Sequence, residues 1–347
     1  GLSVATGLAR RGVSAIALLG RSAPDAQASA VIDELGRGGV RVAVVRGDVD
    51  DPAACARAIA AAEGLAPLRG IFHLAGALRD RAFEQLDGDA FKAVFAGKAF
   101  GAEALARAAR GLSLDAFVLF SSLSAVLGSA GQVNYAAANG YLNGLAQALR
   151  ADGVPAVSVG WGPWLPAAKA GMAATAKGAG RLGVRPLTDD EALPLLELAC
   201  AGARPTLVAA AADFDRFAEQ VAASPRAAVL SGLAKPPAPK APGEPAAGGG
   251  RARGWLRRTI IEADDREGAL RDAIREQICE VLGEDAIDDD AEFVDMGLDS
   301  IMSIDLRARL SGALDLDLPA TAAIDHPDLA SLTRFIMASG ALDRPPA

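Results

Sequence analysis

The stretch FVLFSSLSAVLGSAGQVNYAAANGYLNGLA, residues 117–146, decides the fold of this chain. It opens with an apolar run that ends at Ser121 and Ser122, and it continues into an alanine-rich segment with helical spacing. Continuous hydrophobicity is typical of a strand buried on both faces of a parallel sheet. Similar runs alternate with amphipathic segments at residues 14–19, 40–45, 70–74, 116–120, 156–160 and 206–209. The pattern predicts a doubly wound, Rossmann-like α/β domain with a parallel sheet.

The first residues lack the usual beginning of such a domain. Gly1 leads directly into an amphipathic segment over residues 2–11, and a strand follows. A dinucleotide-binding fold places a strand and a glycine-rich turn before this helix. We therefore expect the sequence to start inside a phosphate-binding loop, so that the sheet is truncated at its N-terminus and lacks its central strand.

A second domain follows a proline- and glycine-rich segment. Residues 235–250 read KPPAPKAPGEPAAGGG, a composition that does not pack into a core. Beyond it, apolar residues recur at helical spacing over residues 269–282, 300–310 and 328–337. The sequence predicts a catalytic domain at residues 1–234, a flexible linker at 235–265 and a small all-α bundle at 266–340.

Composition excludes several classes of function. The net charge is −8 with no clustered basic segment, which argues against a nucleic-acid partner. Cys55, Cys200 and Cys279 lie too far apart for a disulfide framework or a CxxC metal site. Only two histidines, His73 and His326, are present, which argues against a metal site or a Ser-His-Asp triad. Without a membrane span or a signal peptide, we expect a cytoplasmic protein with no membrane partner.

The candidate catalytic residues lie around the opening stretch. Tyr135 comes thirteen residues after Ser122, and Asn139 lies on the same helical face as Tyr135. This arrangement resembles the short-chain dehydrogenase/reductase superfamily, although that superfamily has lysine where this chain has Asn139. Lys98, 24 residues before Ser122, offers the missing cation. The exchange of lysine and asparagine positions resembles the ketoreductases of modular type I polyketide synthases, and the resemblance extends over most of residues 2–233.

The resemblance implies a role for each of these side chains. Hydride addition to a ketone builds negative charge on the carbonyl oxygen, which must be stabilised and protonated. Tyr135 is expected to donate the proton, and Ser122 to hydrogen-bond the same oxygen. The ammonium group of Lys98 is expected to lower the pKa of Tyr135. Asn139 is expected to fix the geometry of the proton relay.

Neighbouring residues of the same types need separate interpretation. Tyr141 is the other tyrosine of the chain, and we interpret it as a packing residue. Ser121 and Ser124 are interpreted as hydrogen-bonding residues at the strand end, although a small misalignment could exchange either with the catalytic serine. Lys92 and Lys98 are both compatible with solvated helix positions, and the spacing together with the resemblance selects Lys98.

The residues after the strands indicate the cofactor. Arg21 follows the strand at 14–19, where an acidic residue would favour NAD and an arginine suits the 2′-phosphate of NADPH. Asp48 and Val49 resemble the pair that contacts the adenine, and Ala75 and Gly76 resemble the glycine-lined approach to the ribose. The predicted NADPH-binding residues are Gly1, Arg21, Ser22, Asp48, Val49, Ala75 and Gly76.

Stereochemistry is read from two positions of the resembled family. Its members with Leu-Asp-Asp after the fourth strand, and no tryptophan eight residues before the catalytic tyrosine, are called B-type and give the D-hydroxy product. Here the stretch reads Leu78, Arg79 and Asp80. Position 127 holds Leu127 rather than tryptophan. B-type is therefore favoured, with exposed loop charges as the alternative interpretation of Arg79 and Asp80.

The segment GWGPW, residues 160–164, opens a stretch rich in glycine and alanine that runs to residue 183. In the resembled family this stretch is a mobile lid over the substrate. We interpret Trp161 and Trp164 as packing residues of the lid rather than as substrate contacts.

The C-terminal bundle resembles an acyl carrier protein domain. The sequence of residues 297–300 is Gly-Leu-Asp-Ser, and an apolar helical face follows Ser300. The segment DHPDLASLTRFI, residues 325–336, resembles the third helix of carrier domains. A serine at a helix start is most often a simple N-cap, but here the resemblance implies that 4′-phosphopantetheine is attached to Ser300, where the helix N-terminus favours a phosphodiester.

Acidic residues are concentrated before this serine. Nine acidic residues and no basic one lie between Glu280 and Asp299. Such a surface would complement basic patches on a phosphopantetheinyl transferase and on partner catalytic domains. The run at residues 288–290 is equally compatible with a solubilising loop.

Together these features predict NADPH-dependent reduction of a β-ketoacyl thioester, carried on the arm of Ser300, to a β-hydroxyacyl thioester in polyketide biosynthesis. The expected partners are the polyketide acyl-thioester intermediate, a phosphopantetheinyl transferase, and upstream ketosynthase and acyltransferase domains. One alternative is a carrier and scaffold segment with an inactive reductase fold. A free-standing alcohol dehydrogenase is a more distant alternative, because it would not explain the linker or the Ser300 segment.

Overall fold

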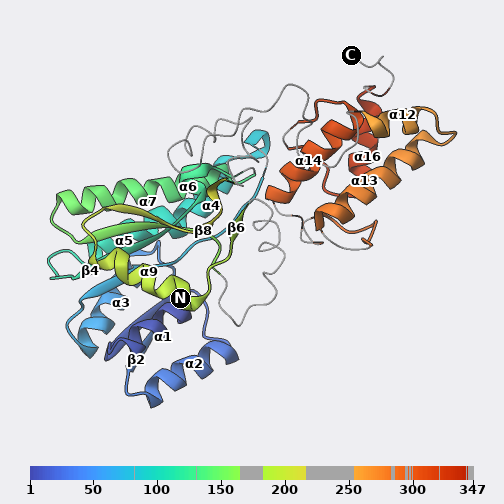
Figure 1. The fold of residues 1–347 in the computed structure, drawn as a ribbon. Coiled ribbons are helices and arrows are strands. Elements are labelled where there is room, and N and C mark those ends of the chain that lie inside the picture. Colours follow the sequence, from blue (N-terminus) through green and yellow to red (C-terminus); the bar gives the residue numbers. More distant parts are fainter. Residues whose placement is uncertain are drawn as a thin grey trace.

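The computed structural model describes residues 1–81, 83–129, 131–164, 183–215, 254–282, 286–293, 296, 298, 300–319, 321–340 and 342. Figure 1 shows an α/β domain, in which helices cover the strands, and a separate group of C-terminal helices. Both parts of the predicted fold class, a parallel Rossmann-like sheet and a small helical bundle, are confirmed.

The strands form two parallel groups. β1 (Ala15–Gly20) pairs with β2 (Arg41–Arg46). β3 (Gly70–His73), β4 (Ala116–Ser122), β5 (Ala156–Trp161) and β7 (Thr206–Ala209) form a four-stranded parallel sheet in this order. Two short strands, β6 (Val184–Arg185) and β8 (Ala211–Ala212), pair antiparallel. The predicted strand positions are confirmed to within two residues.

Helices cover both faces of the four-stranded sheet. Successive side chains of a strand point to opposite faces. Phe117 and Leu119 of β4 pack in a cluster with α3 (Pro52–Leu65), α5 (Gly101–Ala108) and α7 (Val133–Ala151). Val118 and Phe120 pack in another cluster with α1 (Leu2–Arg10) and α9 (Asp189–Ala201). Burial on both faces explains why the strand reads as a continuous apolar run.

The remaining helices of this domain frame the ends of the strands. α2 (Ala26–Arg37) connects β1 to β2, and it begins where the Asp25 carboxylate accepts a hydrogen bond from the backbone of Ala28. The 3-10 helix η1 (Phe83–Gln85) and α4 (Gly88–Phe95) follow β3. α4 continues through a π-helical turn, η2 (Ala96–Phe100), into α5. The short α6 (Ser124–Leu127) follows β4 directly.

In the described part of the C-terminal domain there are five helices: α12 (Trp255–Ile261), α13 (Arg266–Leu282), α14 (Ser300–Leu314), α15 (Ala322–Asp325) and α16 (Leu329–Ala338). The three predicted helices correspond to α13, α14 and α16. α12 was not predicted: it lies within residues 235–265, which the sequence analysis assigned to a flexible linker. Leu256 and Ile260 are buried in the core of the helical domain, so the flexible assignment is wrong for this part of the range.

The two parallel groups of strands are not hydrogen-bonded to each other: among the described residues β1 pairs with β2 only, and β3 pairs with β4 only. The expectation that a central strand is lacking stays a prediction. No helix in the described part of the chain combines the length and the apolar character that a membrane crossing requires.

Candidate active site and carrier site

The carboxyl end of β4 carries the two serines of the opening stretch. Ser121 is buried, and its hydroxyl donates a hydrogen bond of 3.1 Å to the backbone carbonyl of Asn139. Ser122 is partly buried, and its Oγ accepts hydrogen bonds from the backbone N–H of Ser124 at 3.2 Å and from the Ser124 hydroxyl at 3.0 Å. Ser121 and Ser124 are therefore engaged in local bonds, as the sequence analysis expects, and Ser122 is the shared acceptor.

α7 brings Tyr135 and Asn139 to this strand end. Asn139 is fully buried, and its side-chain nitrogen donates a 2.8 Å hydrogen bond to the backbone carbonyl of Tyr135, one helical turn earlier. Its carboxamide oxygen is buried without a hydrogen-bond partner in the part of the chain that the structure describes. A buried acceptor without a donor is costly, and such a group in a folded protein calls for an explanation.

Lys98 reaches the site from the π-helical turn η2. The residue is only 5% exposed, and its ammonium group donates a 2.7 Å hydrogen bond to the backbone carbonyl of Phe120. The same nitrogen lies 5.4 Å from the centroid of the Tyr135 ring, within cation–π distance. Burial lowers the pKa of Lys98 to about 8. Lys92, the competing candidate, has an exposed side chain that pairs with Asp89.

The pKa of Tyr135 corrects one expectation. Burial raises it, and this effect outweighs the hydrogen bonds with Asn139 and Ser122, which lower it; the charge of Asp80 raises it further. From the sequence, Lys98 was expected to lower this pKa. The direction is wrong because desolvation of the phenolate by burial dominates inside the folded domain.

The predicted cofactor residues lie at helix starts and strand ends. Gly1 precedes α1, Arg21 and Ser22 directly follow β1, and Asp48 and Val49 come shortly after β2. Val49 is buried, whereas Arg21 and Ser22 are exposed.

Ala75 and Gly76 follow β3 and approach Lys98. A Cβ atom at Gly76 would lie 2.9 Å from the Cε atom of Lys98. A larger residue at position 76 would therefore require the lysine side chain to shift.

The predicted stereocontrol loop is fastened to the beginning of α7. The carboxylate of Asp80 accepts a 2.8 Å hydrogen bond from the side chain of Gln132, and burial raises the pKa of Asp80. Leu127 is buried in α6, whereas Leu78 is about half exposed. Asp80 is exposed, as the interpretation as a loop charge expects, but its carboxylate is hydrogen-bonded to Gln132.

Asn134 is a site residue that the sequence analysis missed. It is fully buried beside Tyr135, and its amide nitrogen donates a 2.9 Å hydrogen bond to the carbonyl of Arg79 and a longer one, 3.4 Å, to that of Ala90. Its oxygen accepts a 2.8 Å bond from the backbone N–H of Tyr135. Asparagine is common at helix starts, so its position alone carried no signal.

The aromatic residues after β5 pack together. Phe120 stacks on Trp161 with a centroid distance of 5.4 Å, and Trp161 lies 4.8 Å from Trp164. The indole of Trp164 donates a 2.7 Å hydrogen bond to Asp189. These contacts agree with the interpretation of both tryptophans as packing residues. Most of the predicted lid, residues 165–182, lies outside the described residues.

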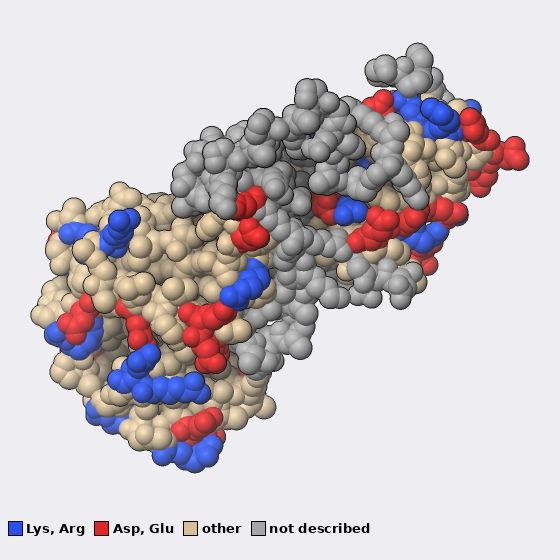
Figure 2. All heavy atoms as spheres, in the orientation of Figure 1, with Lys and Arg blue, Asp and Glu red and all other residues tan. Residues whose placement is uncertain are grey.

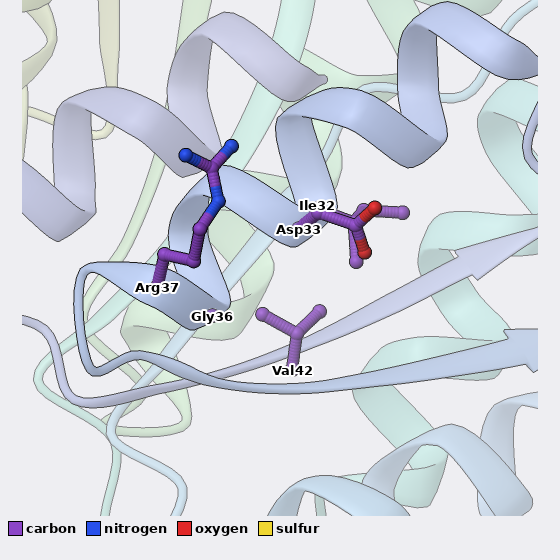
Figure 3. A pocket seen from close by; sticks show the side chains of 5 residues that line it. All are labelled: Ile32, Asp33, Gly36, Arg37 and Val42. Atoms are coloured by element: carbon purple, nitrogen blue, oxygen red, sulfur yellow. The ribbon is translucent and has the colours of Figure 1, made fainter.

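A surface hollow of about 620 Å³ lies elsewhere on this domain (Figure 3). It is lined by Ile32, Asp33, Gly36, Arg37 and Val42, from the second half of α2 and the start of β2. Ligands of open α/β sheets bind at the carboxyl ends of the strands. The hollow lies at the opposite end of β2 and does not belong to the candidate site.

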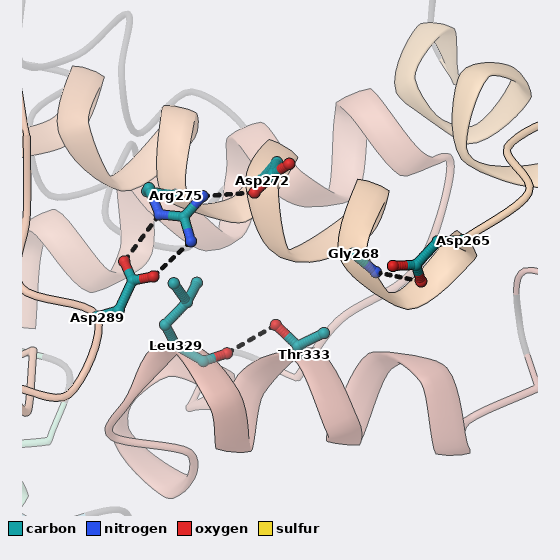
Figure 4. Close-up of polar contacts among 7 residues, drawn as sticks. All are labelled: Asp265, Gly268, Asp272, Arg275, Asp289, Leu329 and Thr333. Carbon is teal, nitrogen blue, oxygen red and sulfur yellow. Dashed lines mark hydrogen bonds and ion pairs between the residues drawn. The ribbon is translucent and has the colours of Figure 1, made fainter.

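In the helical domain, Ser300 is the first residue of α14. This fifteen-residue helix directs its N-terminus, with its partial positive charge, toward the predicted attachment point. The preceding acidic loop is partly anchored by ion pairs. Figure 4 shows Arg275 of α13 between Asp272 and Asp289. The hydrogen bonds from Arg275 lower the pKa of Asp289.

Part of the acidic segment is therefore used inside the domain. Glu280 pairs with Arg309 of α14 at 2.9 Å, and Asp288 accepts a hydrogen bond from the backbone of Asp290. Figure 2 shows acidic side chains gathered on the helical domain, with basic side chains among them. The acidic run thus anchors its own loop as well as charging the surface.

Comparisons with known proteins identify the families of the two domains. The model of the KR domain family matches residues 1–166, and that of the phosphopantetheine attachment site matches residues 272–336. The chain is 38% identical over 340 residues to polyketide synthase GfsA of Streptomyces halstedii, covering 96% of this chain and 4% of that protein. It is 35% identical over 337 residues to mycoketide-CoA synthase of Mycobacterium tuberculosis, covering 95% of this chain and 8% of that protein. The chain thus spans a small part of these relatives.

Solved structures of ketoreductases resemble the α/β domain. An A-type ketoreductase from a modular polyketide synthase matches with a TM-score of 0.60 and 34% identity, over 67% of this chain and 48% of that one. The first ketoreductase of the tylosin synthase matches with a TM-score of 0.56 and 35% identity, over 66% and 52%. A C2-type ketoreductase matches as well, so similarity of fold does not distinguish the subtypes. The chain belongs to the polyketide synthases, with a ketoreductase domain followed by a phosphopantetheine-attachment domain.

Proposed function

We propose that this chain reduces a β-ketoacyl thioester, delivered on a phosphopantetheine arm at Ser300, to the β-hydroxyacyl thioester with NADPH. The observation that carries the proposal is the convergence of Ser122, Tyr135 and Lys98 at the carboxyl end of β4. These side chains come from a strand, a following helix and a π-helical turn, and burial leaves them little freedom.

Tyr135 is the proposed proton donor. A raised pKa keeps its hydroxyl protonated at neutral pH, which is the form that an acid catalyst needs. The Ser122 hydroxyl, which lies near the phenol, would donate to the same carbonyl oxygen as it gains negative charge. The ketone carbon gains a hydride and its oxygen gains the tyrosine proton, so that an alcohol results.

Lys98 and Asn139 restore the donor. After proton transfer Tyr135 is a phenolate, and the ammonium group of Lys98 over its ring stabilises this charge. Lys98 is protonated below a pKa of about 8, so it can return a proton at neutral pH. Asn139 holds the backbone of Tyr135 through its 2.8 Å hydrogen bond.

Two features of the chain fit a nicotinamide cofactor. Gly76 brings the backbone after β3 against the side chain of Lys98, with no side chain of its own at this strand end. The buried oxygen of Asn139, which has no partner among the described residues, can accept a hydrogen bond from an added hydroxyl group. When bound, NADPH supplies the hydride. Arg21, exposed after β1, is the proposed partner of its 2′-phosphate.

We assign the remaining predicted roles on the same basis. Ser22, Asp48, Val49 and Ala75 would line the cofactor path with Gly1. B-type stereochemistry, giving the D-hydroxy product, is supported by Leu127 and by the carboxylate of Asp80, which is hydrogen-bonded to Gln132. The proposed partners are a phosphopantetheinyl transferase and the ketosynthase and acyltransferase domains of a cytoplasmic synthase.

The experiment compares Tyr135→Phe with Tyr141→Phe in the full-length synthase. Both residues lie on α7, but Tyr141 hydrogen-bonds Glu103 and is 37% exposed, away from the site. NADPH oxidation with a diffusible β-ketoacyl thioester should be abolished by Tyr135→Phe and retained in Tyr141→Phe. Equal activity of the two variants would refute the assignment.

A second experiment tests the carrier site by intact-protein mass spectrometry. Treatment with coenzyme A and a phosphopantetheinyl transferase should add one arm to the wild-type chain and none to Ser300→Ala. Ser311→Ala, in the same helix, is the matched control and should be modified normally. Modification of Ser300→Ala would exclude this serine as the attachment residue.

One observation favours the scaffold alternative. β1 and β2 are not hydrogen-bonded to the four-stranded sheet among the described residues, although the cofactor would contact the ends of strands from both groups. Titration of NADPH fluorescence with the full-length synthase separates the two functions. The reductase proposal requires saturable binding, and the scaffold alternative requires none.

A further inference from the structure

His73 is a buried histidine for which the reaction above has no use. It ends β3 and is 2% exposed. Its Nε2 atom lies 2.9 Å from the backbone carbonyl oxygen of Lys98, 25 residues later in the chain. A carbonyl oxygen accepts hydrogen bonds only, so Nε2 must carry the hydrogen.

The charge state of His73 agrees with this assignment. Burial lowers its pKa to about 4, even though the backbone carbonyls of Lys98 and Gly97 raise it. The ring is therefore neutral near pH 7, with a single N–H. A neutral imidazole that is almost inaccessible to solvent cannot exchange protons with a substrate, and its function has to be sought in the bond to Lys98.

This bond lies at an unusual point of the helix. Residues 96–100 form a π-helical turn between α4 and α5. A π-helical turn takes one residue more than an α-helical turn, and it is stable only where other contacts favour it. An α-helix advances about 100° per residue, because it has 3.6 residues per turn. Relaxation of η2 to a regular helix would therefore turn Lys98 away from its position relative to α4 or α5.

The segment after β3 also fixes the side chain of Lys98. Gly76, three residues after His73, passes so close that a Cβ atom would lie 2.9 Å from the lysine Cε. The ammonium group meets the carbonyl of Phe120 at 2.7 Å. The lysine is thus held at its backbone by His73, along its side chain by Gly76, and at its tip by Phe120.

We propose that His73 is a positioning residue: its Nε2–H holds the carbonyl of Lys98, maintains the π-helical turn and so aims the ammonium group at Tyr135. The inference rests on the proposed role of Lys98 in the reduction. It assigns a function to a polar group in the core, where a hydrophobic residue would otherwise be expected.

The experiment uses His73→Gln and His73→Asn in the full-length synthase. A glutamine amide nitrogen can occupy the place of Nε2, whereas an asparagine amide is one methylene too short. Ile71→Ala is the matched control, because Ile71 is buried on the same face of β3 two residues earlier and its loss weakens packing without removing the donor.

Two measurements are made on each variant. Hydrogen-exchange mass spectrometry of the peptide around residues 94–104 reports on the π-helical turn without any cofactor or activity. Steady-state kinetics with NADPH and a diffusible β-ketoacyl thioester separate kcat from KM. Loss of protection in this peptide tests the present inference, whereas absence of reduction in the wild type tests the proposed function, so the two failures are distinguishable.

We expect His73→Asn to exchange at least tenfold faster in this peptide and to lose at least tenfold in kcat with little change in KM. His73→Gln should stay within about threefold of the wild type in both, and Ile71→Ala should not lose protection selectively there. Wild-type protection and kcat in His73→Asn would overturn the proposal. A folded His73→Gln variant that loses both protection and kcat would also overturn it. So would a selective loss of protection of this peptide in Ile71→Ala.

Discussion

The ammonium nitrogen of Lys98 lies 2.7 Å from the backbone carbonyl oxygen of Phe120. Phe120 stands two residues before Ser122 in β4, so this bond ties the cation to the strand that carries the proposed oxyanion donor. The contact places a charge in a region with almost no access to solvent, and its consequences can be measured in three ways.

The rate of reduction should fall above about pH 8. Lys98 is protonated below its lowered pKa of about 8 and becomes neutral above it. Tyr135, with a raised pKa, remains protonated over the same range. The pH dependence of kcat between pH 6 and 10 should therefore show one alkaline limb. Lys92→Met should keep this limb, because Lys92 is exposed, and a rate that is flat up to pH 10 would contradict the proposed role of Lys98.

Lys98→Met should stabilise the fold at pH 7. The pKa of Lys98 is about 8 in the folded state, against a usual value of 10.5. Below pH 8 this difference lowers the free energy of unfolding by about 3 kcal/mol. Loss of the charge-assisted hydrogen bond to Phe120 offsets about 2 kcal/mol, which leaves a net gain of about 1 kcal/mol in the free energy of unfolding.

The direction in which the free energy of unfolding changes with pH is the sharper test of the burial of Lys98. Between pH 8 and 10.5 the unfolded wild-type chain binds more protons at Lys98 than the folded one, so its stability rises with pH. Lys98→Met should lack this rise, and urea titrations at pH 7 and pH 10 would measure it. If the free energy of unfolding changed equally between pH 7 and pH 10 in the wild type and in Lys98→Met, Lys98 would not be desolvated.

Asn134→Ala should loosen the loop that carries Asp80. The substitution removes the bonds to the carbonyl of Arg79 and to the backbone N–H of Tyr135, and it should cost about 2–3 kcal/mol. We expect a lower kcat and a mixture of hydroxy stereoisomers by chiral chromatography. Asn143 lies on the same helix as Asn134 and accepts a 2.7 Å hydrogen bond from Ser158 of β5. Asn143→Ala should destabilise the domain but keep a single stereoisomer. A single stereoisomer from both variants would leave Asn134 with a structural role only.

Arg275→Ala should release the acidic loop from α13. The Asp289 side chain is 44% exposed, so after screening by solvent the ion pair contributes only about 1 kcal/mol. The pKa of Asp289 is lowered in the folded state. The stabilisation by the ion pair is therefore present at neutral pH and is lost as the pH falls through the lowered pKa of Asp289. The variant should thus differ from the wild type at pH 7 and converge with it in acid, as followed by thermal unfolding. If the wild type and Arg275→Ala differed in thermal stability as much in acid as at pH 7, the pairing of Arg275 with Asp289 would be contradicted.

Sequence patterns were sufficient for the strands, for most of the helices and for the side chains that meet at the carboxyl end of β4. The apolar run before Ser122 predicts strand β4, and the interval from Ser122 to Tyr135 predicts which face of α7 carries the tyrosine. Both predictions depend on local spacing along the sequence. The direction of the Tyr135 pKa could not be read this way, since it depends on how much surrounding structure removes water. The contact between His73 and Lys98 depends on a π-helical turn that no hydrophobic period encodes. α12 was missed because Leu256 and Ile260 follow a segment whose composition is typical of a linker.

The central claim is reduction of a substrate held on Ser300, and mass spectrometry of the loaded carrier tests it most directly. The full-length synthase is charged with a β-ketoacyl phosphopantetheine arm by a phosphopantetheinyl transferase and then given NADPH. We predict that the arm gains two hydrogen atoms in the wild type and in Tyr141→Phe, and none in Tyr135→Phe. An unchanged arm in the wild type, or the same gain in Tyr135→Phe, would contradict the account.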